Sequence, residues 1–288
     1  MKKLIVVTGP TASGKTDLAV RLALEHNTEI ISADSRQIFR GIPIVTAIPD
    51  LAQRMGVIHH LMEMLPLDAY YSAAMFEEDA LRIAYEIWKK RDVVVVCGGS
   101  MMYVDALLYG IDELPTVPDS IRLPLTEEWK SKGDDWLRDR LKALDPEYYQ
   151  KVDLANMKRV FHAVEICLSA GVSYTSLRTG KRKSRDFEIE KIVIDLPREQ
   201  LFDRINQRVL RMVDAGLEEE ARRVYPLRHL NSLNTVGLKE MFAFFDGKMD
   251  FETALARIQK NTRVYAKKQL TWLNRNNNPE TRNLKPET

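Results

Sequence analysis

Short runs of apolar, β-branched residues alternate with amphipathic segments in the first third of the chain. The apolar runs lie at 4–7, 29–32 and 93–96. Their Val and Ile content is typical of strands that are buried on both faces of a parallel sheet. Amphipathic helices are predicted over 16–25 and 72–90, with Ser72 as the N-cap of the second. The alternation of strand and helix therefore predicts an α/β fold with a doubly wound parallel sheet.

The later pattern divides the chain into a core and an insertion. A fourth strand-like run, "EKIVIDLP", follows only after a polar, helix-rich stretch over 116–188. We therefore expect a core domain formed by 1–115 and 189–275, and a helical insertion domain over 116–188. A long helix is predicted over 251–275, at the end of the core. The polar residues 276–288 are predicted to form a disordered tail.

Composition excludes several classes of protein. The 288 residues include 43 basic and 41 acidic side chains, and the net charge of +2 gives no global attraction to nucleic acid. Cys97 and Cys167 lie far apart without nearby histidines, which indicates two structural thiols in a reducing compartment. No apolar stretch is long enough for a membrane span, and the first run is too short for a signal peptide. We therefore expect a cytoplasmic protein with no membrane partner.

A phosphate-binding motif follows the first run. Residues 9–16, "GPTASGKT", match the P-loop pattern G-x4-G-K-[ST] and lie between a predicted strand and a predicted helix. In such a loop the backbone N–H groups face a diphosphate, Lys15 adds a positive charge and Thr16 can bind Mg²⁺. The motif leaves open which diphosphate is bound. The predicted diphosphate-binding residues are Gly9, Thr11, Ala12, Ser13, Gly14, Lys15 and Thr16, and the predicted metal ligand is Thr16.

Two further strand ends are expected to lie beside the P-loop. Asp34 follows the second run and is a candidate for catalysis, because crevice sites in α/β sheets form at the carboxyl ends of strands. Asp195 follows the fourth run and is interpreted as a strand-end cap. After the third run, Gly98 and Gly99 permit a close backbone approach, and Ser100 is predicted to begin a helix. These residues predict a second wall of the same crevice.

Eight segments follow one another in the order that is known from one enzyme family. They are "GPTASGKT", "ISADSRQIF", "HHLMEM", "CGGSMMYVDALLYG", "NMKRVFHAVEICLSAG", "INQRVLRMVDAGLEEEARRV", "VGLKE" and "TRVYAKKQLTWLNR". Together they resemble the bacterial tRNA dimethylallyltransferases, also called tRNA isopentenyltransferases or IPP transferases. The resemblance implies a P-loop NTPase-like core and Mg²⁺ as cofactor. It also implies transfer of the dimethylallyl group from dimethylallyl diphosphate to N6 of adenosine 37, in the anticodon arm of tRNA.

The resemblance implies roles for individual residues. Asp34 would orient the amine and accept its proton, Arg208 would complete the clamp on the leaving diphosphate, and Ser100 would belong to the catalytic set. The alternative role for Asp34 is an Asx turn at a strand end. A stacked adenine has to be extruded before it can react, so a second set of residues would hold the RNA. The implied tRNA-binding residues are Asp34, Ser35, Arg36, Gln37, Arg122, Lys158, Arg159, His162, Lys239, Arg263, Lys267 and Lys268.

Local charge favours RNA binding independently of the resemblance. A few positions depart from the family. The stretch "RTGKRKSR" holds five basic residues in eight, and the basic residues of 257–275 fall on one arc of a helix. The family usually has Gly-Thr-Ala-Lys-Pro where this chain reads "VTAIP" at 45–49, and an arginine where His162 stands. Three alternatives stay open: an adenine-nucleotide prenyltransferase, an ATP-dependent small-molecule kinase and a non-catalytic RNA-binding protein. The protein is expected to be a monomer.

Overall fold

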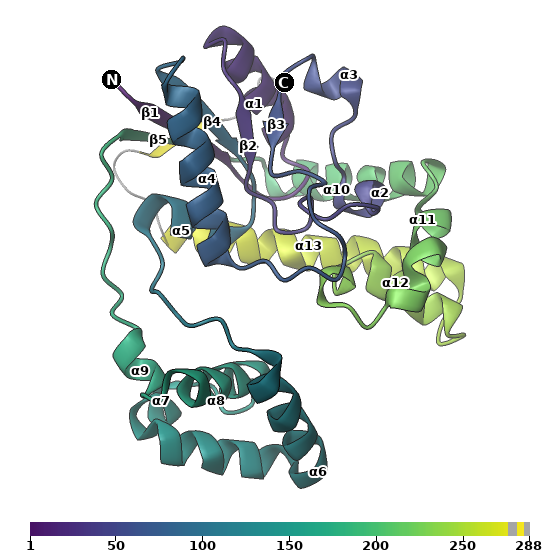
Figure 1. The fold of residues 1–288 in the computed structure, drawn as a ribbon. Helices are drawn as coiled ribbons and strands as arrows, with labels where there is room; N and C mark the ends of the chain where they lie inside the picture. Colours follow the sequence, from purple (N-terminus) through teal and green to yellow (C-terminus); the bar gives the residue numbers. More distant parts are fainter. Residues whose placement is uncertain (276–280, 285–288) are drawn as a thin grey trace. The chain divides into compact units, whose positions relative to one another are not determined.

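A parallel sheet forms the centre of the core (Figure 1). The computed structural model describes residues 1–275 and 281–284. Within these residues, six strands pair in the order β3-β2-β4-β1-β5-β6, and every pair is parallel. The strands are β1 (Lys3–Thr8), β2 (Ile30–Ser32), β3 (His59–His60), β4 (Val93–Cys97), β5 (Glu188–Ile194) and β6 (Thr281–Leu284). The predicted α/β fold is confirmed, although the two-residue strand β3 was not foreseen.

Helices connect the strands and continue after β5. In the core they are α1 (Lys15–Glu25), α2 (Pro43–Thr46), α3 (Leu51–Arg54), α4 (Ala73–Trp88), α5 (Met101–Tyr109), α10 (Arg198–Asp214), α11 (Leu217–Val224), α12 (Leu238–Phe245) and α13 (Phe251–Arg275). The Ser72 side chain accepts a hydrogen bond from the Met75 N–H, so the predicted N-cap of α4 is confirmed. The bounds of α13 are those predicted. No described helix is both long enough and apolar enough to span a membrane.

The strand order explains where a site can form. Helix α1 buries Ala19, Val20 and Ala23 in one cluster with strand residues such as Ile5 and Val95. Strand β4 lies between β2 and β1, although β2 comes directly after β1 in the chain. The carboxyl ends of β1, β2 and β4 therefore meet at one edge of the sheet, where open α/β sheets bind their ligands.

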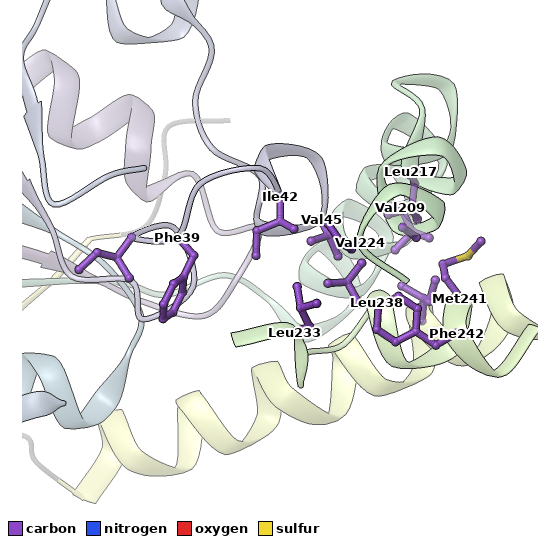
Figure 2. Close-up of a cluster of buried hydrophobic side chains, with 13 residues drawn as sticks. Phe39, Ile42, Val45, Val209, Leu217, Val224, Leu233, Leu238, Met241 and Phe242 are labelled. Atoms are coloured by element: carbon purple, nitrogen blue, oxygen red, sulfur yellow. The ribbon is translucent and has the colours of Figure 1, made fainter. Parts of the chain in front are cut away.

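A second apolar cluster fixes the segment that follows β2. Phe39, Ile42 and Val45 belong to one buried cluster with side chains of α10, α11 and α12, and Figure 2 shows Val45 next to Val224 of α11. Buried Glu220 on α11 accepts hydrogen bonds from the Ile44 and Val45 N–H groups. Burial of apolar surface stabilises this contact, and Glu220 satisfies the buried N–H groups of the segment. The segment 36–48 is thereby held beside the C-terminal helices.

The chain divides into two compact units. The first comprises 1–109 and 184–288, and the second comprises 110–183. Both boundaries lie a few residues before the predicted ones. Residues just before β5 belong to the core because Phe187 packs on Trp88 and Arg185 forms an ion pair with Glu77.

The second unit is helical, as its sequence pattern predicts. Its helices are α6 (Asp119–Leu144), α7 (Pro146–Lys151), α8 (Met157–Ala170) and α9 (Tyr174–Leu177). Helix α6 changes direction at Gly133, whose φ is 82°. Leu137 and Leu141 of α6 pack against Val160 and Val164 of α8 in a common apolar cluster. This unit therefore has a core of its own.

The predicted disordered tail is wrong for four residues. Thr281–Leu284 form β6, which pairs with β5 from Lys191 to Ile194. An edge strand offers unpaired backbone groups, so a polar segment can add to a sheet without an apolar pattern. The other residues of the predicted tail, 276–280 and 285–288, lie outside the described residues.

Candidate active site

The P-loop forms a cradle at the end of β1. Gly14 has a φ of +94° and precedes α1, so the first N–H groups of that helix are available to an anion. The Ser13 hydroxyl is buried and has no hydrogen-bond partner among the described residues. A buried polar atom without a partner is costly unless a ligand satisfies it. The loop therefore fits a bound phosphate group.

Lys15 is the cation of this cradle. Its Nζ donates a hydrogen bond of 2.7 Å to the Pro10 carbonyl, which keeps the side chain over the loop. Burial lowers the pKa of Lys15 to about 8, with Arg208 acting in the same direction and Cys97 and Asp34 opposing it. A diphosphate in the cradle would restore the charged form, because an opposite charge nearby favours it.

This pKa predicts how binding depends on pH. Lys15 is charged below pH 8 and loses its proton above it, so the affinity for a diphosphate ligand should be constant near pH 7. Above pH 8 it should weaken by up to about tenfold per pH unit. The measurement is a calorimetric titration of the protein with the diphosphate between pH 7 and pH 9.5.

The control for this titration is Lys15→Arg. A guanidinium stays charged over this range, so the variant should bind with little change in affinity between pH 7 and pH 9.5. Parallel profiles for the two proteins would contradict the assignment to Lys15.

The loop after β4 lies against the ends of β1 and β2. A Cβ on Gly98 would lie 2.2 Å from the Ala33 carbonyl oxygen, so only glycine fits there. Ser100, which directly precedes α5, accepts a hydrogen bond of 2.8 Å from the Ser35 N–H. The predicted second wall is thus present, and Ser100 orients the segment that carries Asp34.

Asp34 forms the Asx turn that was its alternative role, and its catalytic role stays a prediction. Its Oδ1 accepts hydrogen bonds from the Arg36 N–H at 2.8 Å and the Gln37 N–H at 3.3 Å, which is an Asx turn. Within residues 1–275 and 281–284, no hydrogen bond is found to Oδ2. The turn therefore holds the carboxylate in place and leaves one oxygen for a ligand.

Arginines of α10 line the cradle from the other side. Arg208 donates to the Thr11 hydroxyl at 3.0 Å, and Arg204 donates to the Ser13 carbonyl at 3.4 Å. Burial lowers the pKa of Arg208, and Asp34 opposes this shift. An arginine keeps its charge even so, since its ordinary pKa is above 12. Arg208 is therefore a fixed cation beside the P-loop.

Two cavities meet at these residues. The P-loop cavity, of about 880 Å³, is lined by the P-loop, Gly98, Gly99 and α10. The adjoining cavity, of about 610 Å³, is lined by residues of α10, α12 and α13. The residues that line both are Thr11, Asp34, Thr46, Arg208, Met212 and Tyr265. A phosphate group and a second molecule could thus be bound on the two sides of Asp34 and Arg208.

Besides Arg36, four of the residues proposed to bind RNA lie on the adjoining cavity. They are Asp34, Ser35, Lys239 and Lys268. The ammonium groups of Lys239 and Lys268 and the hydroxyl group of Ser35 are suited to contact a polyanion. Their contact with RNA stays a prediction.

Other proposed RNA-binding residues of the core are engaged with the protein. Arg36 lines the adjoining cavity, but its guanidinium donates to the carbonyls of Asn231, Ser232 and Asn234. The Gln37 amide donates to the carbonyls of Thr46 and Ala47, each at 3.1 Å. Arg263 donates to Asn206, and Lys267 is exposed with its Nζ over the Phe202 ring. These contacts order the walls, and the RNA contacts stay predictions.

The remaining residues of this set lie on the second unit. Arg122 donates to both carboxylate oxygens of buried Glu165, at 2.8 and 3.3 Å, and His162 hydrogen bonds to one of them at 2.9 Å. Burial raises the pKa of Glu165, but the hydrogen bonds from His162 and Arg122 outweigh it and lower the pKa on balance. Lys158 and Arg159 are exposed on the same helix, α8. Arg122 therefore has a structural partner besides its predicted RNA contact.

We expect Arg122→Ala to destabilise the protein. The change leaves the Glu165 carboxylate buried with one partner fewer, which should cost about 1–3 kcal/mol. The free energy of unfolding of Lys158→Ala, a change on the exposed face of α8, should stay within about 0.5 kcal/mol of the wild-type value. Urea unfolding followed by tryptophan fluorescence measures both. Equal stability of the two variants would show that the Arg122–Glu165 pair contributes nothing.

Tyr265 and Gln269 were missed as individual residues, although "TRVYAKKQLTWLNR" was recognised as a segment. Both lie on the P-loop cavity. Partial desolvation raises the pKa of Tyr265, which is 38% exposed, to about 12, and the negative charge of Asp34 adds to this shift. Gln269 is 3% exposed. The basic residues around them suggested a solvated face, and a buried polar side chain gives no periodic signal. Asp195 lines neither cavity and is exposed.

The described residues contain no cluster of three or more His, Cys, Asp or Glu side chains that could hold a metal. Mg²⁺ commonly uses few protein ligands together with substrate phosphates. Thr16 is the second residue of α1, directly after Lys15, and lines the P-loop cavity, so its hydroxyl fits such a site. Cys97 lies nearby, but burial raises the pKa of its thiol to about 11, which keeps it neutral.

Comparison with known proteins indicates one family. Residues 37–276 match the family model described as IPP transferase. A tRNA dimethylallyltransferase 1 of Bacteroides thetaiotaomicron is 48% identical over 275 residues, 96% of this chain and 89% of that protein. A tRNA dimethylallyltransferase 2 of Porphyromonas gingivalis is 50% identical over 272 residues, 94% of this chain and 91% of that protein.

Solved structures of similar proteins share the fold. The full-length tRNA isopentenylpyrophosphate transferase of Bacillus halodurans superposes with a TM-score of 0.71 and 32% identity, over 99% of this chain and 90% of that chain. A eukaryotic dimethylallyltransferase acting on tRNA superposes with a TM-score of 0.79 and 26% identity, over 95% of this chain and 70% of that chain.

Proposed function

The chain belongs to the IPP transferase family, and we propose that it transfers the dimethylallyl group of dimethylallyl diphosphate to N6 of adenosine 37 in tRNA, with release of diphosphate. The observation that carries this proposal is the meeting of two cavities at Thr11, Asp34 and Arg208. A two-substrate transfer needs a donor and an acceptor on opposite sides of the reacting atoms. The P-loop cavity would hold the donor, and the adjoining cavity the extruded adenine.

In the proposed reaction the cradle stabilises the leaving group. The bond between C1 of the dimethylallyl group and the diphosphate oxygen breaks, and its electron pair leaves with the diphosphate. Lys15, Arg208 and the start of α1 line the P-loop cavity, where their donors would face the oxygens on which this charge grows. Preorganised donors at such a position lower the barrier more than they strengthen ground-state binding. When bound at Thr16, Mg²⁺ would add Lewis-acid stabilisation of the same charge.

Asp34 acts on the acceptor in this scheme. As N6 forms its bond to C1, the amine becomes acidic, and its proton passes to the Asp34 carboxylate. The Asx turn leaves Oδ2 available for this transfer, and Ser100 orients the neighbouring Ser35. A carboxylate within hydrogen-bond reach is sufficient as the base. Lys239, Lys268 and, on the second unit, Lys158 and Arg159 would contact the anticodon arm.

The test is an incubation of the protein with Mg²⁺, dimethylallyl diphosphate and an anticodon stem-loop that carries adenosine at position 37. Digestion and mass spectrometry should detect isopentenyladenosine in the stem-loop. AMP and ATP, supplied separately as acceptors, test the nucleotide prenyltransferase. Turnover of ATP to ADP with no prenyl product would support a kinase, and stem-loop binding without any product would support a non-catalytic RNA-binding protein.

A further inference from the structure

A single buried side chain of α13 links the two loops of the active site. Gln269 is 3% exposed. Its Oε1 accepts a hydrogen bond of 2.8 Å from the Thr11 N–H in the P-loop. Its Nε2 donates a hydrogen bond of 2.9 Å to the Gly99 carbonyl in the loop after β4. The two loops follow different strands, β1 and β4, and Gln269 bridges them.

The surroundings require a side chain with both a donor and an acceptor at this position, which an amide supplies. A backbone N–H can only donate and a carbonyl oxygen can only accept, so the bridging group needs one acceptor and one donor. A carboxylate supplies only acceptors, and an apolar side chain supplies neither. A Cβ on Gly99 would lie 2.5 Å from Nε2 of Gln269 and 3.3 Å from the Gly9 carbonyl oxygen. The close approach of the loops therefore depends on glycine at 99 and glutamine at 269.

Thr11 is the residue on which this bridge acts. Its N–H is held by Gln269 from α13, and its hydroxyl is held by Arg208 from α10. Thr11 lines both cavities, so its position affects the donor and the acceptor side together. Tyr265, one turn before Gln269 on the same side of the helix, also lines both.

We propose that Gln269 is a positioning residue for prenyl transfer, which sets the separation of the P-loop and the Gly98–Gly99 loop. The inference rests on the proposed function and adds to it a residue that touches neither reacting group. It acts by fixing the Thr11 N–H and the Gly99 carbonyl, and thereby the alignment of the donor with Asp34. Misplacement of reacting groups by about 1 Å can cost about 10²-fold in rate.

The test compares Gln269→Met and Gln269→Glu with Trp272→Phe. Trp272 lies one turn further along α13, and its indole N–H donates to Asp105 at 2.8 Å, outside both cavities. It is therefore a control for the docking of the helix. We expect kcat to fall about 10²-fold in Gln269→Met, with the KM for the stem-loop within about twofold of wild type, and Trp272→Phe to keep wild-type kcat. Gln269→Glu retains only the acceptor, so its kcat should lie between that of Gln269→Met and that of wild type.

Hydrogen exchange separates this inference from the proposed function. In the ligand-free protein, exchange of the Thr11 amide should become about tenfold faster or more in Gln269→Met and stay unchanged in Trp272→Phe. This readout needs no prenyl transfer, so it holds even if the proposed function fails. Unchanged exchange and kcat in Gln269→Met would overturn the inference. An equal loss of kcat and of amide protection in Trp272→Phe would also overturn it, because the effect would then come from the docking of the helix.

Discussion

Replacing Asp34 by Asn is expected to lower kcat for prenyl transfer about 10²–10⁴-fold and to leave the fold intact. An Asn side chain presents the same acceptor oxygen to the Arg36 and Gln37 N–H groups, so the Asx turn should persist. In the proposed scheme it cannot accept the proton from N6, so the transfer would lose its base. Single-turnover kinetics with saturating stem-loop and donor measure the chemical step, and thermal unfolding measures the fold.

Two further variants separate the base from the turn. Asp34→Ala removes both, so it should lose at least as much activity and also show altered proteolysis around 34–37. Asp195→Asn changes an exposed carboxylate at the end of β5 that lines neither cavity, and it should retain wild-type kcat. An Asp34→Asn variant with normal single-turnover kinetics would restrict Asp34 to the Asx turn.

The family and the parallel core could be predicted from the sequence, and both are confirmed. The Val and Ile runs of β1 and β4 identify strands that are buried on both faces, and "GPTASGKT" identifies the loop between β1 and α1. Strands β3 and β6 could not be predicted. With two and four residues they have too little periodicity, and they are defined by pairing with β2 and β5.

The site was only partly predictable, because many of its contacts join residues far apart in the sequence. The P-loop and Asp34 follow strands, so their position at one sheet edge could be inferred. The partner of Arg122 could not, since Glu165 lies 43 residues away and is identified by burial rather than by a motif. Gln269 lies 258 residues from Thr11, and its amide resembles any polar residue of a basic helix until its burial is known. Side chains that hold loops together are therefore the part of the site that could not be identified without the structure.

The second large effect is expected for Arg208→Gln. Arg208 donates to Thr11, lines both cavities and is the α10 cation at their junction. Glutamine keeps a donor but removes the charge that faces the leaving diphosphate in the proposed scheme. Because this charge grows only as the C–O bond breaks, kcat should fall about 10²–10³-fold and the KM for the donor should rise less. Steady-state kinetics with dimethylallyl diphosphate as the varied substrate give both constants.

Two further variants, Arg208→Lys and Arg211→Gln, test whether the effect depends on the Arg208 guanidinium in particular. Lysine retains the charge and three N–H donors, but these donors radiate from one atom and lack the rigid planar spacing of a guanidinium. It should therefore hold the Thr11 hydroxyl and a phosphate oxygen less well and recover only part of the lost kcat. Arg211 also lines the P-loop cavity but is exposed, where solvent weakens its field, and Arg211→Gln should remain close to wild type. If Arg211→Gln lost as much kcat as Arg208→Gln, total positive charge along α10 would govern the reaction. A loss confined to Arg208 would mean that one guanidinium, fixed against Thr11, stabilises the departing diphosphate.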